Sequence, residues 1–128
     1  MMNRFRSLRV LVVDATPSMA QALSVILKEN GHDASPAFSA AEALVSCRHK
    51  WPDVVIIGTL SEPQEGAQLA TEVMGGYPEC RVLRISDDLP PSTLSQQSRA
   101  IDRNLPALAK PINSRAILSY LNNIHLPK

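Results

Sequence analysis

The chain has 128 residues, with 13 lysines and arginines against 12 aspartates and glutamates. This length suits one domain with one hydrophobic core, and a net charge of +1 gives no electrostatic basis for binding nucleic acid or an anionic membrane. The sequence shows neither a secretory signal nor a run approaching the ~18 apolar residues of a membrane span. We therefore expect a single domain over residues 1–128, located in the cytoplasm.

Cysteine and histidine residues show no spacing typical of a metal site. Cys47 and Cys80 are far apart in sequence, and His32, His49 and His125 are scattered. We interpret the cysteines as structural thiols in a reducing compartment, and we expect no metal ligands among the histidines.

The first apolar run and the segment after it predict a strand and a helix. Residues 9–13 read RVLVV, which is typical of a buried strand. Thr16 and Pro17 predict the start of the helix, and Gly31 predicts its end. The predicted inward face of this helix consists of Met19, Leu23, Ile26 and Leu27.

The middle of the chain repeats this alternation. A short strand is expected at 33–37, and Ser39 and Glu42 have the spacing of a capping box at the start of a helix that ends near Lys50. The run at 53–57 lacks polar alternation, so we expect a strand covered on both faces.

A third helix is expected from Glu65 to Met74, closed by Gly75 and Gly76. Residues 81–86 predict a fourth strand.

The last part of the chain predicts a weak helix, a strand and a strong helix. The stretch 87–104 offers few apolar anchors, so we expect a short helix there. Residues 106–110 predict a fifth strand and 113–124 a final helix. Its predicted inward side chains are Ile117, Leu118, Leu121 and Ile124.

Five strands alternating with five helices indicate an α/β fold with a parallel sheet covered on both faces. In such sheets, ligands bind outside the carboxyl ends of the strands. The residues at those ends are Asp14, Ala15, Gly58, Ser86, Asp87 and Lys110.

Five pieces of the chain, in this order and spacing, carry a family resemblance: LRVLVVDA, NGHDASPAFSAAEAL, PDVVII, EGAQLA and LAKP. Together they resemble the receiver domain of bacterial two-component response regulators. The resemblance implies a flavodoxin-like (βα)5 three-layer sandwich, with a parallel five-stranded sheet of order 2-1-3-4-5.

The family's phosphorylation pocket is only partly retained. Asp14 matches the first of two acids after strand one, Ser86 the hydroxyl after strand four, and Lys110 the lysine after strand five. Ala15 stands in place of the second acid, and Gly58 in place of the phosphoacceptor aspartate. The resemblance therefore implies a degenerate pocket with no catalytic residue, in a protein that is not an enzyme.

These replacements affect both requirements of receiver phosphorylation. Glycine offers no nucleophile, and Asp14 alone is a poor Mg²⁺ site, so we expect no cofactor and at best weak Mg²⁺ binding. Gly58 has two interpretations: a turn that needs positive φ, or neutral loss of the aspartate. We expect Asp14 and Lys110 to pair.

Two functional hypotheses follow. The first is a stand-alone receiver-like signalling module that acts by phosphorylation-independent protein–protein interaction, with a histidine kinase or an output protein as partner, or as a homodimer. The resemblance places that contact on helix 4, strand 5 and helix 5, including Arg99, Arg103, Arg115 and Tyr120.

The alternative is an atypical phosphoacceptor receiver that uses Asp87, Asp88 or Glu62 in place of the missing aspartate. Neither hypothesis involves nucleic acid or a membrane.

Overall fold

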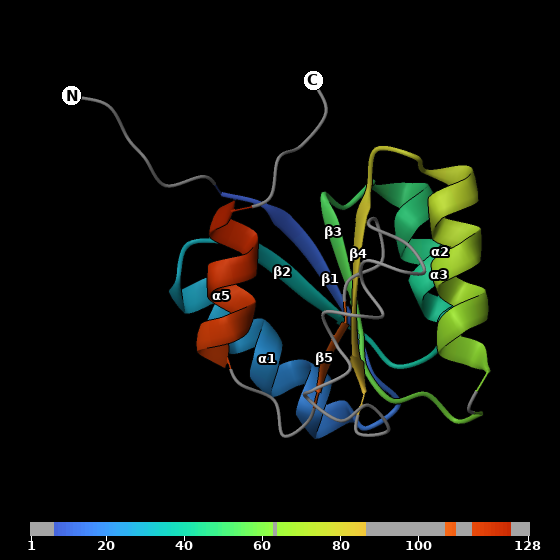
Figure 1. The fold of residues 1–128 in the computed structure, drawn as a ribbon, viewed down its shortest axis with the longest axis horizontal. Helices are drawn as coiled ribbons and strands as arrows, with labels where there is room; N and C mark the ends of the chain where they lie inside the picture. Colours follow the sequence, from blue (N-terminus) through green and yellow to red (C-terminus); the bar gives the residue numbers. More distant parts are fainter. Residues whose placement is uncertain (1–6, 63, 87–106, 110–113, 124–128) are drawn as a thin grey trace.

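The computed structural model describes residues 7–62, 64–86, 107–109 and 114–123. A single parallel sheet has the strand order β2-β1-β3-β4-β5, which is the order expected above (Figure 1). Its strands are β1 (Arg9–Val13), β2 (Asp33–Ala37), β3 (Val54–Ile57), β4 (Arg81–Ser86) and β5 (Ala107–Ala109).

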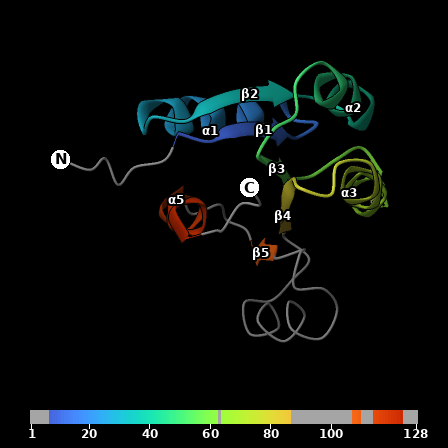
Figure 2. The ribbon, with the colours of Figure 1, turned by 90° about the horizontal axis from the view of Figure 1, so that it is seen from above.

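Helices cover both faces of this sheet. The described helices are α1 (Pro17–Glu29), α2 (Ala40–His49), α3 (Glu65–Gly76) and α5 (Ser114–Asn123). Figure 2 shows α1 and α5 on one face and α2 and α3 on the other, which gives three layers. The weak helix predicted at 87–104 lies outside the described residues. None of the described helices is long and apolar enough to cross a membrane.

The central strand β3 explains why helices must cover both faces of the sheet. All four of its residues are buried. Val54 and Ile56 join the hydrophobic cluster under α1 and α5, whereas Val55 and Ile57 join the cluster under α2 and α3. The prediction that this strand is covered on both faces is therefore confirmed.

The inward face of α1 differs from the predicted one. Met19 is 36% exposed, and the buried residues of the helix are Ala20, Leu23, Ser24 and Leu27. The small side chains of Ala20 and Ser24 let the helix lie close to the sheet, and the Ser24 hydroxyl donates to the Ala20 carbonyl at 2.8 Å. A hydrophobicity pattern alone favours Met19 over a serine as an inward residue. The predicted inward face of α1 is therefore rotated about the helix axis relative to the observed one.

Most predicted helix ends agree with the structure. Thr16 is the N-cap of α1, although its side chain makes no capping bond, and Gly31 has a φ of 92° after the helix. In the α2 capping box, the Glu42 amide donates to Ser39 Oγ at 3.1 Å, and Glu42 Oε1 accepts from the Phe38 amide at 2.9 Å.

The end of α3 differs from the predicted one, and the described part of α5 ends at Asn123. Gly75 and Gly76 do not stop α3 at Met74, because both continue the helix without positive φ. In α5, Ile117 and Leu121 are buried and Leu118 is partly buried, whereas Ile124 lies outside the described residues.

A buried histidine at the start of the sheet makes stability depend on pH. His32 is 5% exposed, its Nδ1 accepts the Leu8 amide at 3.2 Å, and burial lowers its pKa below 6.5. The neutral ring therefore contributes stability above pH 6.5, which is lost as pH falls through 6.5 to the lower folded-state pKa.

Urea unfolding should show a larger loss of stability on acidification for the wild type than for His32→Asn, whose amide oxygen accepts without titrating. Equal losses would contradict this role.

Both cysteines should be unreactive in the folded protein. Cys47 and Cys80 are buried free thiols, and burial raises the pKa of both, that of Cys80 to about 12. Because the thiolate is the reactive form, a thiol-specific chromogenic disulfide reagent should label neither at pH 8 until urea is added. Glu72→Cys, at an exposed position of α3, provides the reactive control. Rapid native labelling of either wild-type thiol would show that the core under α2 and α3 opens.

Candidate functional site

The carboxyl ends of β1 and β3 bring two of the predicted site residues together. These strands pair with Val13 opposite Ile57, so Asp14 and Gly58 follow them side by side. The Gly58 amide donates to the Val13 carbonyl at 2.7 Å, and the Asp14 amide donates to the Ala37 carbonyl at 3.0 Å. Backbone hydrogen bonds thereby connect the carboxyl ends of β2, β1 and β3.

The side chain of Asp14 adds a second connection between the loops after these strands. It is 3% exposed, and its Oδ1 accepts the Thr16 amide at 2.9 Å while its Oδ2 accepts the Thr59 amide at 3.2 Å. The Ala15 amide donates in turn to the Thr59 carbonyl at 2.8 Å. Asp14 therefore forms an Asx-type turn into α1 and also binds the loop after β3.

Gly58 makes room for this carboxylate. A Cβ built on Gly58 would overlap Oδ2 of Asp14 and lie 3.1 Å from its Cγ. Among the described glycines only Gly31 has a positive φ, so the interpretation of Gly58 as a left-handed turn is wrong. The constraint at position 58 is space, because the Asp14 carboxylate occupies the volume that a side chain would need.

The chemical capacity of this edge follows from these contacts. Position 58 carries no side chain, Ala15 offers no oxygen, and both oxygens of Asp14 accept backbone amides. Within the described ranges, no group of three or more His, Cys, Asp and Glu side chains is arranged to hold a metal ion.

The other predicted pocket residues end or follow β4 and β5 in sequence. Ser86 is the last residue of β4. The side chains expected to complete or replace the pocket, Asp87, Asp88 and Lys110, lie outside the described residues. The expected pairing of Asp14 with Lys110 therefore stays a prediction.

Glu62, the third candidate for an alternative phosphoacceptor, lies on the surface at the start of α3. Its side chain is exposed, its amide donates to Glu65 Oε1 at 3.0 Å, and its carbonyl accepts the Glu65 amide at 3.1 Å. The backbone of Glu62 thus takes part in starting α3.

Of the predicted interaction surface, only α5 and the backbone of β5 are described. Arg115 is exposed, whereas Tyr120 is partly buried against the cluster under α1 and α5, and burial raises its pKa. Tyr120 therefore contributes to the core as well as to the surface. Arg99 and Arg103 lie outside the described residues.

A charged side chain that was not predicted from the sequence, Arg84, lies beside this edge. Arg84 pairs in register with Ile57, and its guanidinium packs against α3, with Cζ 3.2 Å from where a Cβ of Gly66 would lie. An arginine within the otherwise apolar segment VLRI was the available signal. Gly66 and Gly58 thus both give space to a charged side chain.

The sequence is similar to those of response regulators. No family model matches the chain. It is 31% identical over 94 residues to the DNA-binding response regulator MtrA of Mycolicibacterium smegmatis, and 30% identical to MtrA of Mycobacterium tuberculosis H37Rv. Each match covers 73% of this chain but only 37% of the relative, so the chain spans little more than a third of these proteins.

Comparison of the structure with solved structures finds the same fold in receiver domains of low sequence identity. The chemotaxis protein CheY4 of Vibrio cholerae has a TM-score of 0.77 at 24% identity, with 94% of this chain and all of that chain covered. A CheY-like receiver domain protein from Methanospirillum hungatei has a TM-score of 0.74 at 18% identity, with 91% of each chain covered. The chain therefore has the flavodoxin-like α/β fold seen in these CheY-like proteins.

Proposed function

We propose that this domain is a signalling module of the two-component type that acts through protein–protein contacts without being phosphorylated. The observation that carries the proposal is the position of the Asp14 carboxylate, which fills the space of a side chain at position 58. A receiver with this arrangement lacks the attacking carboxylate at position 58. Its neighbouring acid, Asp14, accepts hydrogen bonds from backbone amides.

The chemistry of phosphoryl transfer supports this proposal. An aspartyl phosphate forms only when a carboxylate attacks the donor, and Mg²⁺ must neutralise the phosphoryl oxygens. Gly58 removes the attacking carboxylate and Ala15 removes a ligand. The remaining acid, Asp14, would have to give up the Thr16 and Thr59 amides to bind the ion. We therefore propose that Mg²⁺ binds weakly at best and that no cofactor is needed.

The same contacts suit a domain held in one signalling state. Asp14 joins the loop after β1 to the loop after β3 by hydrogen bonds within the chain. A partner protein would then bind a surface whose conformation does not change.

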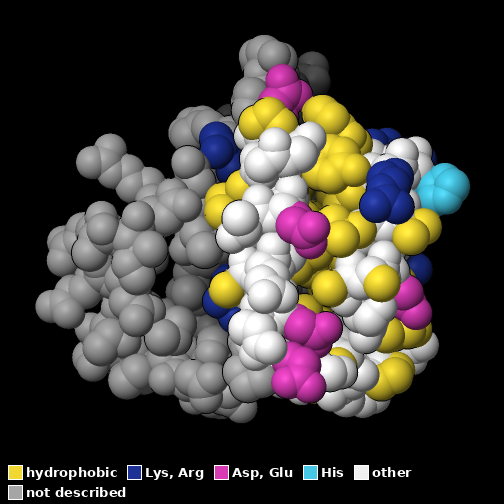
Figure 3. Space-filling view, turned by 90° about the vertical axis from the view of Figure 1, so that its right-hand side faces the viewer, with side chains coloured by type: hydrophobic (Ala, Val, Ile, Leu, Met, Phe, Trp, Pro, Cys, Tyr) yellow, Lys and Arg dark blue, Asp and Glu magenta, His cyan; other side chains and the backbone are white. Residues whose placement is uncertain are grey.

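The described surface over α2 and α3 offers apolar side chains for such a partner. Viewed from that side, hydrophobic side chains gather over the two helices (Figure 3). Val45 is 48% exposed and Trp51 is 45% exposed, and the Trp51 ring meets Tyr77 edge to face at 5.1 Å. Exposed apolar side chains that lie together are typical of protein-binding surfaces.

The proposed partner is a protein in the cytoplasm, such as a histidine kinase or an output protein, or a second copy of the domain. The MtrA relatives are described as DNA-binding, which refers to proteins of which this chain matches 37%. For the domain itself we propose no nucleic-acid or membrane contact, because its net charge is only +1.

Treatment with acetyl phosphate and Mg²⁺ tests the proposal directly. Intact-mass spectrometry at neutral pH should show no added phosphate on the wild type. Gly58→Asp alone should also phosphorylate poorly, because the new carboxylate collides with Asp14 and position 15 still lacks an acid. A stable mass increase of one phosphate on the wild type, lost in Asp87→Ala, Asp88→Ala or Glu62→Ala, would instead establish the atypical phosphoacceptor.

A double-mutant cycle tests the contact between positions 14 and 58. Gly58→Ala should displace the Asp14 carboxylate, and Asp14→Ala should leave the Thr16 and Thr59 amides without this acceptor, at ~1–3 kcal/mol each. In the double mutant no collision remains, so its loss of unfolding free energy should be smaller than the sum.

Gly75→Ala is the matched control for this cycle, because a Cβ there meets nothing within 4 Å and should not destabilise the helix. Additive losses at positions 14 and 58 would mean that the two residues do not share this space.

A further inference from the structure

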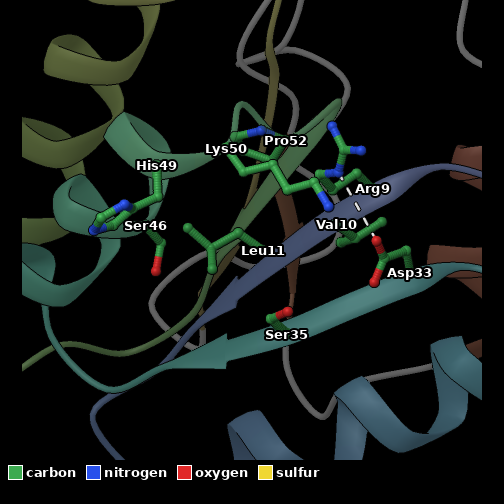
Figure 4. A pocket seen from close by; sticks show the side chains of 9 residues that line it. All are labelled: Arg9, Val10, Leu11, Asp33, Ser35, Ser46, His49, Lys50 and Pro52. Atoms are coloured by element: carbon green, nitrogen blue, oxygen red, sulfur yellow. Dashed lines mark ion pairs between the residues drawn. The ribbon is translucent and has the colours of Figure 1, made fainter.

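A groove lined by both charged and apolar residues lies away from the carboxyl edge of the sheet. It has a volume of about 280 Å³ and lies between α2 and the strands β1 and β2 (Figure 4). Arg9 and Asp33, which line it, are the first residues of their strands, whereas Asp14 and Gly58 follow the opposite ends of β1 and β3. The groove is therefore separate from the receiver pocket.

The shape of α2 and the sequence of β2 explain why the groove stays open. Asp33, Ser35 and Ala37 alternate on the α2 side of β2, but only Ala37 is buried against the cluster under α2 and α3. Leu11 of β1 lines the groove, and Ser35 and Ser46 face it from the strand and the helix. Polar side chains on two walls keep this space from closing into the core.

Positive charge predominates around this space. Arg9, His49 and Lys50 line the groove with Asp33 as the acidic residue. The Lys50 side chain points toward Arg9 in Figure 4, and among the described residues the structure records no ion pair for Lys50. The residues that line the groove thus include two permanent cations and one carboxylate.

Arg9 is held in place but its charge is only loosely compensated. Its Nη1 donates to the Trp51 carbonyl at 3.1 Å, and its amide donates to Asp53 Oδ2 at 2.8 Å. Its Nε lies 3.8 Å from Asp33 Oδ2, beyond hydrogen-bond distance, and the Asp33 side chain is 62% exposed. A guanidinium whose ion pair is with an exposed carboxylate is weakly compensated, and it retains N–H donors for an additional anion.

We propose that this groove binds a small phosphate-bearing ligand, either free phosphate or a phosphate monoester. Arg9 and Lys50 would supply the charge, and Ser35 and Ser46 would supply hydroxyl donors from the opposite side. A carboxylate has only two oxygens to accept hydrogen bonds, whereas a phosphate group has more. A phosphate group therefore makes better use of the donors from these four side chains. The inference is independent of the signalling proposal, because none of these residues belongs to the receiver pocket.

Amide chemical shifts in a two-dimensional NMR titration test the site. Sodium phosphate and glycerol 3-phosphate are added separately at constant ionic strength, with sodium acetate as the comparison anion. Saturable shifts are expected at Ser35, Ser46 and Lys50 but not at Thr59. Tighter binding of glycerol 3-phosphate would identify the monoester as the ligand, and equal binding would identify the phosphate group alone.

Two substitutions of equal charge provide the decisive control. Lys50→Gln should weaken phosphate binding roughly tenfold, because it removes a charge-assisted hydrogen bond. Lys28→Gln, in the exposed last turn of α1 on the other face of the sheet, should leave the affinity unchanged. Ser35→Ala is the second variant if Lys50→Gln alters the fold. The site is refuted if shifts do not saturate, if acetate binds as tightly, or if both lysine variants weaken binding equally.

Discussion

The carboxylate of Asp14 is the interaction on which the carboxyl edge of this sheet depends. In a buried position, an acid needs donors for its charge, and here the Thr16 and Thr59 amides supply them. That arrangement is possible only because position 58 is glycine. The glycine at position 58 and the backbone contacts of the Asp14 carboxylate are thus two aspects of one packing solution, which supports the proposed absence of phosphorylation.

The sequence predicted the layers of the fold well because they depend on periodicity. The unbroken apolar run of β3 requires cover on both faces, and the capping residues Thr16 and Ser39 mark where α1 and α2 begin. Periodicity was less informative where small residues decide the packing. Met19 was expected to face inward, but Ala20 and Ser24 bring α1 close to the sheet and leave Met19 at the surface.

The site was less predictable because its contacts involve the backbone. The sequence shows that Asp14 and Gly58 follow neighbouring strands, but not that the carboxylate folds over the glycine or accepts the Thr59 amide. The groove beside β2 was missed for a related reason. Arg9 and Ser35 come together only through the pairing of β1 with β2, and Lys50 joins them only through the placement of α2. Residue types alone could not indicate either arrangement.

Amide hydrogen exchange at Thr16 and Thr59 tests the central claim most directly. Both amides should be protected in the wild type, and Gly58→Ala should accelerate their exchange about tenfold or more by displacing the acceptor. The Asp33 amide, which donates to the Leu8 carbonyl at the other end of the sheet, should be unaffected. Unchanged protection of Thr16 and Thr59 in Gly58→Ala would contradict the account, because the Asp14 carboxylate would then not need the space above Gly58.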